Sequence, residues 1–148
     1  MNKFLKYVLV VNLSFIIFSA IVLLLHPVFQ DSSIVSGGII KALFEFISIY
    51  TIGVGFPLFA VILSGIYQYK NPNFREYGKS LLITFSFVIL FCISIPTFLF
   101  LNGRFEGGLS MEGGQFLVII GMISIAIFIS SAIINLATLF VSRHFLKK

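Results

Sequence analysis

The segment GGQFLVIIGMISIAIFISSAIINLATLFVS, Gly113–Ser142, runs for 30 residues without an Asp, Glu, Lys, Arg or His. A helix needs about 20 apolar residues to cross the hydrocarbon core of a bilayer, and in lipid its backbone groups must pair within the segment. Three similar runs precede it: 19 residues after Lys6, 24 after Glu45 and 24 after Lys79. The sequence therefore predicts an all-α integral membrane protein, a four-helix bundle in one domain, residues 1–148, with spans at about 7–25, 46–66, 80–101 and 117–141.

Composition supports the same class of protein. The 148-residue chain is 59% hydrophobic and 10% charged, with a mean hydropathy of +1.12. A soluble domain carries about 25% charged residues, so most of this surface must face lipid. The first apolar run is longer than the roughly 7–15 residues of a signal peptide core, and no A-x-A-like cleavage site follows it. We therefore expect residues 7–25 to be a retained span.

Basic residues are unevenly distributed among the segments outside the expected spans. Eight of the ten lie before span 1, between spans 2 and 3 or after span 4, and these segments contain one acid, Glu76. The other two connections hold Lys41 and Arg104 against four acids. The positive-inside rule then predicts that both termini are cytoplasmic, in a bacterial inner membrane. The basic excess fits contact with anionic lipid headgroups, and the loops are too short to form a nucleic-acid-binding surface.

A weak internal repeat relates the two halves of the chain. A shift of 76 positions aligns Gly37–Gly38 with Gly113–Gly114, and Ile47–Ile49 with Ile123–Ile125. Duplication would give two tandem helical hairpins of the same orientation. Convergence of two apolar hairpins would give the same matches, so both explanations stay open.

Span 4 carries a stripe of small and polar residues that share one helix face. These residues recur at steps typical of a heptad, and they are Gly114, Gly121, Ser124, Ser131, Asn135, Thr138 and Ser142. In membranes such a face lets backbones approach closely and supplies interhelical hydrogen bonds. The stripe is either a packing seam inside the bundle or a polar groove that passes a substrate or docks a helix of another protein.

Two asparagines lie within spans at similar depth. On a helical rise of about 1.5 Å per residue, Asn12 and Asn135 both lie on the order of 10 Å from the nearest inner charges. We therefore expect a hydrogen bond between them that joins spans 1 and 4.

The segment TIGVGFP, residues 51–57, is predicted to bend span 2. Pro57 lacks a backbone donor, and its ring clashes with the carbonyl one turn earlier, that of Gly53. Gly53 and Gly55 make the bend easier. Broken helices can mark transport sites, although they also occur in membrane proteins that transport nothing.

Lys41 and Glu45 lie four residues apart at the outer end of span 2. The uncharged run 46–69 is long enough to cross the bilayer by itself, so both charges can act as an anchor in the outer headgroup layer. Alternatively, Glu45 lies below the interface and faces the bundle interior, where a carboxylate is a functional candidate by default. Glu45 is the leading site hypothesis.

Residue types for catalysis or metal binding are scarce. Cys92 is the only cysteine, and the two histidines, His26 and His144, are predicted on opposite sides of the membrane. Haem, di-iron and zinc sites need more inward-facing ligands, and no phosphate loop or nucleophile motif occurs. We expect no enzyme activity, no metal and no cofactor.

The first functional interpretation is a non-catalytic membrane protein that acts through helix–helix contacts, as an accessory subunit or partner of another membrane protein, for example an immunity protein. The alternative is a small oligomeric transporter or channel for an ion or a small or lipid-linked solute. The candidate residues for either function are Lys41, Glu45, Asn12, Asn135, Gly121, Ser124, Ser131, Thr138, Gly53, Gly55 and Pro57.

Overall fold

The computed structural model describes residues 3–30, 38–101 and 111–146. This part of the chain forms α1 (Lys3–Gln30), α2 (Gly38–Tyr50), a π-helical turn η1 (Thr51–Gly55), α3 (Phe56–Lys70), α4 (Phe74–Leu101) and α5 (Met111–Leu146). Four helical segments within it are long and apolar enough to cross a membrane: Lys3–Leu25, Gly38–Lys70, Phe74–Ser94 and Val118–Phe145. The predicted all-α fold with four helices of this kind is confirmed.

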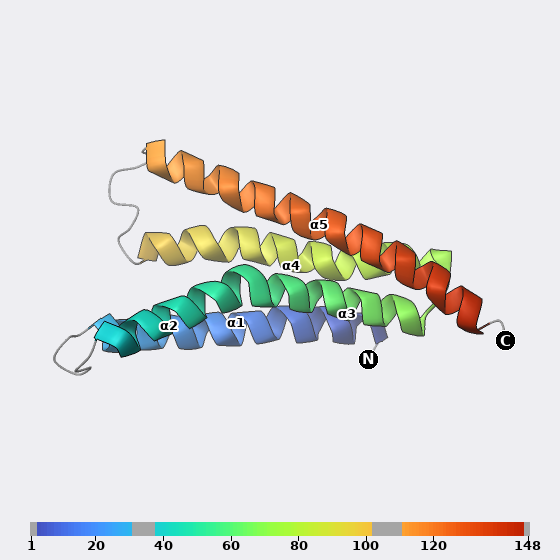
Figure 1. Ribbon diagram of the computed structural model, residues 1–148, viewed down its shortest axis with the longest axis horizontal. Coiled ribbons are helices and arrows are strands. Elements are labelled where there is room, and N and C mark those ends of the chain that lie inside the picture. The colour runs from blue at the N-terminus through green and yellow to red at the C-terminus, as the bar shows by residue number, and fades with distance from the viewer. Residues whose placement is uncertain (1–2, 31–37, 102–110, 147–148) are drawn as a thin grey trace.

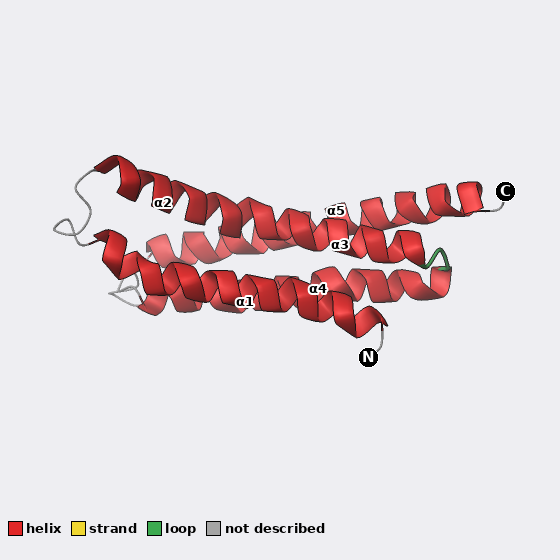
Figure 2. Cartoon of the chain, turned by 90° about the horizontal axis from the view of Figure 1, so that it is seen from below, coloured by secondary structure: helices red, strands yellow, loops and turns green. Residues whose placement is uncertain are grey.

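Helices α3 and α4 form the centre of the bundle, and each contacts both α1 and α5. The two perpendicular views place α1 and α5 on opposite sides of this central pair (Figures 1 and 2). Both ends of the chain and the turn between α3 and α4 lie at the same end of the bundle. We call it the basic end, because the nearby sequence contains Lys3, Lys6, Lys70, Arg75, Lys79 and Arg143. The opposite end is the far end.

Aromatic and aliphatic side chains fill the space between α1, α3 and α4. Val11, Phe15, Ile83 and Phe87 are at most 1% exposed. The ring of Phe15 packs edge-to-face on Phe56 and Phe87, with ring centres 5.3 and 5.4 Å apart. Lipid is as apolar as these side chains, so helix association depends on van der Waals packing and polar contacts. Each edge-to-face pair adds about 0.5–1.5 kcal/mol beyond simple burial.

A short turn, Asn71–Asn73, joins α3 to α4 at the basic end. The backbone N–H and the side-chain amide of Asn71 both donate to the Tyr67 carbonyl, at 3.1 and 2.9 Å, and so end α3. From α5, Arg143 Nε donates to the Pro72 carbonyl at 3.1 Å, and the guanidinium lies 4.5 Å from the centre of the Phe74 ring. These contacts fix the end of α5 to the α3–α4 hairpin.

The π-helical turn η1 lies where the sequence predicts a bend. The N–H of Phe56 donates to the carbonyl of Thr51, five residues back instead of four. Pro57 follows at the start of α3, where it has no N–H to donate. A π-turn absorbs such a break in the hydrogen-bond ladder at the cost of a kink. Within the described chain, neither Gly53 nor Gly55 meets another helix at its Cβ position, so both glycines belong to the turn and not to a packing seam.

Beyond this turn α2 departs from the centre of the bundle. Its main contacts within the described chain are with α1 and with its own continuation η1, whereas α3 contacts α1, α4 and α5. Figure 1 shows α2 and α5 on the two outer sides of the molecule at the far end. The bundle is therefore closed at the basic end and splayed at the far end.

Close approach between helices occurs at Gly65 of α3. A Cβ atom on Gly65 would lie 3.5 Å from Ile134 Cγ2 and 4.0 Å from Thr138 Oγ1 of α5. Gly121 of α5 has nothing within 4 Å of the corresponding position. Within the described chain, Gly121 therefore does not mark the close approach between helices that a packing seam would place there. Helix α5 diverges from α4 toward the far end (Figure 1), and Gly121 lies in the half of α5 nearer that end, whereas Thr138 lies in the half nearer the basic end.

The glycines give a direct test of this packing. Gly65→Leu should destabilise the folded protein by about 1–3 kcal/mol, because the added atoms have no space between α3 and α5. Gly121→Leu, the matched control on the splayed part of α5, should change stability by less than about 0.5 kcal/mol. Reversible unfolding in mixed micelles measures both. Equal losses in the two variants would contradict the placement of the close approach.

Candidate functional site

A polar layer lies between α3, α4 and α5 in the half of the bundle near the basic end. It consists of Ser64 on α3, Thr84 on α4, and Ser131 and Asn135 on α5, all 0% exposed. Ser131 Oγ lies 2.7 Å from Thr84 Oγ1 and 3.2 Å from Ser64 Oγ. Asn135 Nδ2 donates to Ser64 Oγ at 3.2 Å and to Ser131 Oγ at 3.1 Å. We call these four residues the polar layer.

One arrangement of hydrogens satisfies every hydroxyl in the polar layer. Ser64 donates its proton to the Val61 carbonyl at 2.8 Å, so it can only accept from Ser131 and Asn135. Ser131 then donates to Ser64 and accepts from Thr84 and Asn135, which uses its one donor and two acceptor sites. The polar layer is thus a connected network that links three helices and uses all of its hydroxyl and amide protons. In this arrangement Thr84 Oγ1 keeps acceptor sites, and Asn135 Oδ1 has no donor among the described residues.

The expected hydrogen bond between Asn12 and Asn135 does not form. Asn12 Nδ2 donates to Ser86 Oγ of α4 and to the Val8 carbonyl, both at 3.0 Å. Both asparagine Oδ1 atoms are buried without a hydrogen-bond donor, so neither amide can accept from the other. The reason is topological, because α1 and α5 lie on opposite sides of the α3–α4 pair (Figures 1 and 2). A similar position along the bundle axis does not make two helices neighbours.

A second set of polar contacts lies between the polar layer and the α3–α4 turn. Ser80 donates to Gln68 Oε1 at 3.0 Å, and Gln68 Nε2 donates to the Asn71 carbonyl at 3.2 Å. Tyr77 donates to the Ala132 carbonyl of α5 at 3.1 Å. Gln68 and Ser80 are both 0% exposed. These bonds hold the closed end of the bundle together.

Sequence reasoning missed most of the residues that complete these networks. The signal was present as two pairs at four-residue spacing, Ser64 with Gln68 and Ser80 with Thr84. Each pair lies on one face of its helix, as any residues four apart do. The polar stripe on span 4 is longer and therefore easier to recognise in the sequence. Its Ser131 nevertheless contacts residues of these shorter pairs, Ser64 on α3 and Thr84 on α4.

The remaining residues of the span 4 stripe have different environments. Ser124 is 7% exposed, and its hydroxyl lies 3.1 Å from Cys92 Sγ of α4. Thr138 is half-buried opposite Gly65, with its hydroxyl donating to the Ile134 carbonyl of its own helix. Ser124, Ser131 and Asn135 thus form a packing seam within the chain, and Gly121 does not join it.

Lys41 and Glu45 lie on the inner face of α2. Both are half-buried, and Ser48, one turn beyond Glu45, is buried. The side chains of Ile40, Leu43 and Phe46 on the other faces are exposed. Glu45 is 25 residues from Lys70; at 1.5 Å per residue this is about 37 Å, and a hydrocarbon core is about 30 Å thick. Glu45 therefore lies on the bundle side of α2, farther from Lys70 along the helical rod than a hydrocarbon core is thick.

The side of α5 that faces away from the polar layer also carries small residues. Ala126, Ser130 and Ala137 are exposed, and Ala126 and Ser130 have the small-xxx-small spacing of membrane helix contacts. Ser130 is the immediate neighbour of the fully buried Ser131. The stripe predicted for span 4 does not include the residues of this second face.

The described residues contain no group of three or more His, Cys, Asp or Glu side chains that could hold a metal ion. Comparison with protein-family models, with curated proteins and with solved structures finds no match for this chain. Function must therefore be argued from the geometry alone.

Ser130 and Ser131 are adjacent on α5, but Ser130 is exposed and Ser131 is buried. Substituting each serine in turn therefore compares the outer and inner faces of this helix. Ser131→Leu should destabilise the protein by at least about 2 kcal/mol, because it removes the hub of the polar layer and overfills the space between three helices. Ser130→Leu should change stability by less than about 0.5 kcal/mol. Thermal unfolding of the purified variants in one detergent provides the comparison. Similar melting temperatures for the two variants would show that the polar layer does not stabilise the bundle.

Proposed function

We propose that this chain is a polytopic inner-membrane protein with both termini in the cytoplasm, which acts without catalysis as a partner of another membrane protein. The observation that carries the proposal is the exposed face of α5 with Ala126, Ser130 and Ala137. Small residues let a second helix approach closely, and in lipid such approach is a main source of helix association. The internal seam of α5 is already occupied, so this face remains for an external helix.

The splayed far end supports the same proposal. There α2 and α5 lie on the outer sides of the molecule and have large exposed apolar side chains. A transmembrane helix of another protein would find two long apolar surfaces and one face of small residues on this side of the chain. An accessory subunit or an immunity-type protein, which recognises its target inside the bilayer, fits this arrangement.

The transporter alternative has one observation in its favour. The π-helical turn and Pro57 interrupt span 2, and Glu45 lies on the bundle side of the same helical rod. Broken helices and intramembrane carboxylates both occur in transport sites. The polar layer argues against a route along the bundle axis for a substrate that needs donors, because its hydroxyl protons and the Asn135 amide donors are already bound within the chain.

The partner proposal makes a prediction for co-purification from native membranes. The wild-type chain in mild detergent should retain another membrane protein in fixed stoichiometry, detected by mass spectrometry and by the native mass of the complex. Ser130→Leu should release this partner by blocking the close approach while the chain still folds. Glu45→Gln should retain it.

Two outcomes would contradict the partner proposal. One is a homo-oligomer without a foreign protein. The other is a partner that Ser130→Leu leaves bound. In the first case, ion flux through proteoliposomes becomes the decisive measurement. Loss of that flux in Glu45→Gln, with Lys41→Gln as the matched control at the same end of α2, would establish the transporter alternative.

A further inference from the structure

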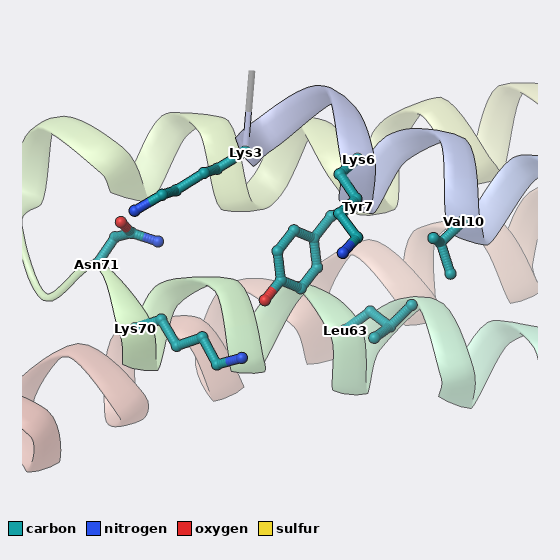
Figure 3. Close-up of a pocket in the computed structure, with 7 residues that line it drawn as sticks. All are labelled: Lys3, Lys6, Tyr7, Val10, Leu63, Lys70 and Asn71. Atoms are coloured by element: carbon teal, nitrogen blue, oxygen red, sulfur yellow. The ribbon is translucent and has the colours of Figure 1, made fainter. Parts of the chain in front are cut away.

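A pocket opens between α1 and α3 at the basic end of the bundle. Its volume is about 450 Å³, and it is lined by Lys3, Lys6, Tyr7, Val10, Leu63, Lys70 and Asn71. Figure 3 shows the three lysine side chains approaching it from two helices and the Tyr7 hydroxyl pointing into it. We call it the basic pocket. It is separate from the polar layer and from the exposed face of α5, so a lipid there rests on the membrane location in the proposed function but not on the proposed partner.

The basic pocket concentrates positive charge without a counter-ion. None of Lys3, Lys6 and Lys70 forms an ion pair with a carboxylate in the described part of the chain. The acid at this end, Glu76, is already engaged, since it accepts from Tyr67 at 2.5 Å and pairs with Lys79 at 2.7 Å. Like charges held in one concave site repel each other and raise the local concentration of anions. The site is therefore suited to an anion.

The donors in the basic pocket match a phosphate group. Three ammonium groups supply charge-assisted hydrogen bonds, which phosphate oxygens accept strongly. The Tyr7 ring is held edge-to-face against Tyr67 at 5.4 Å, so its hydroxyl has a fixed direction between Lys6 and Lys70 (Figure 3). The Asn71 amide lies beside the Lys3 side chain at the other end of the pocket (Figure 3). These groups surround one space from several sides.

The wall of the basic pocket becomes apolar toward the middle of the bundle. Val10 lies about one helical turn beyond Lys6, and Leu63 lies about two turns beyond Lys70. Both line the pocket, and Val10 is 43% exposed to the surroundings of the bundle. A soluble anion would leave this apolar wall uncovered. A molecule with a phosphate at one end and hydrocarbon at the other would cover it.

We propose that the basic pocket binds an anionic phospholipid, with its phosphate among Lys3, Lys6, Lys70 and the Tyr7 hydroxyl. The first carbons of its acyl chains lie along Val10 and Leu63. If the four candidate spans cross the bilayer, the basic end lies in the headgroup layer, where basic pockets between helices bind acidic lipids. The same lipid bridges α1 and α3 and neutralises the lysines.

Native mass spectrometry of the full chain in mild detergent tests this proposal. The protein is titrated with phosphatidylglycerol, with phosphatidylcholine of the same chain length, and with glycerol phosphate as a phosphate without hydrocarbon. We expect phosphatidylglycerol to bind at least about tenfold more tightly than phosphatidylcholine, because attraction to three lysines favours net negative charge. Glycerol phosphate should not displace it at equal concentration.

Charge-matched variants separate the basic pocket from general attraction to a basic surface. Lys6→Gln/Lys70→Gln should weaken phosphatidylglycerol binding about 25-fold, at roughly fivefold per lysine. Arg75→Gln/Lys79→Gln removes the same charge at the same end but outside the pocket lining, and should weaken binding less than about threefold. Tyr7→Phe keeps the ring contact and should weaken binding severalfold. All substituted side chains except Tyr7 are exposed, so the lipid-free melting temperatures should agree.

Three results would each overturn the proposal. Equal losses in the two double variants would show that lipid binds to surface charge and not to the pocket. Equal binding of phosphatidylcholine and phosphatidylglycerol would show that the anionic group is not recognised. Displacement of the lipid by glycerol phosphate at equal concentration would assign the site to soluble phosphates.

Discussion

The hydroxyl of Ser131 is the contact on which the rest of the structure depends. It meets Thr84 of α4, Ser64 of α3 and Asn135 of its own helix, at a point where none of these side chains is exposed. In an apolar environment such a group must be paired, because an unpaired hydroxyl or amide costs more than the bond contributes. Each interhelical bond in a membrane contributes only about 0.6 kcal/mol on average. The larger effect is geometric, since bonds from Ser131 and Asn135 to two other helices favour one rotation and one register for each of the three helices.

This constraint explains why the two ends of the bundle differ. Near the polar layer, α5 is held by Gly65 packing, by the Tyr77 hydroxyl on the Ala132 carbonyl and by Arg143 on the α3–α4 turn. Toward the far end, the polar contact described for α5 is the weaker one between Ser124 and Cys92. Helix α1 is held differently, by the Phe15 aromatic cluster and the bond from Asn12 to Ser86. The polar and packing contacts of α5 thus concentrate at the closed end, whereas α2 and α5 have large exposed apolar side chains toward the splayed end.

The four long apolar helices could be predicted from sequence because they depend on a one-dimensional property. Crossing a bilayer needs a run of apolar residues of a fixed length, and the runs between Lys6, His26, Glu45 and Lys70 are read directly from the chain. The face of α5 that carries Ser131 and Asn135 is equally visible, because helical periodicity determines it. Which helix meets that face is a property of the three-dimensional arrangement. Helical periodicity gives the direction of a side chain around the helix axis, but it does not identify the helix that packs against that side chain.

The errors of the sequence analysis follow from the same distinction. Asn12 and Asn135 were paired by depth, and the order of helices around the bundle separates them. Gly121 shares the periodicity of the seam, but no atom from another helix of the described chain lies within 4 Å of its Cβ position. Two polar residues on one helix face often occur together by chance. The sequence alone therefore does not single out the pairs Ser64 with Gln68 and Ser80 with Thr84. The bend at Pro57 was predictable because the chemistry of proline is local.

The basic residues show how one feature can have two physical consequences. Their number at one end is enough to predict orientation, and for that purpose any arrangement of the charges would serve. The arrangement seen here is more specific. Lys3 and Lys6 come from the first turns of α1 and Lys70 from the last turn of α3, and the two helices bring them around one space with an apolar wall. A topology signal needs only a count of charges, whereas a binding site needs convergence of charges from separate helices. Convergence without a carboxylate in the pocket lining leaves a repulsion that the described protein does not itself relieve, and the acidic lipid proposed for this pocket would neutralise it.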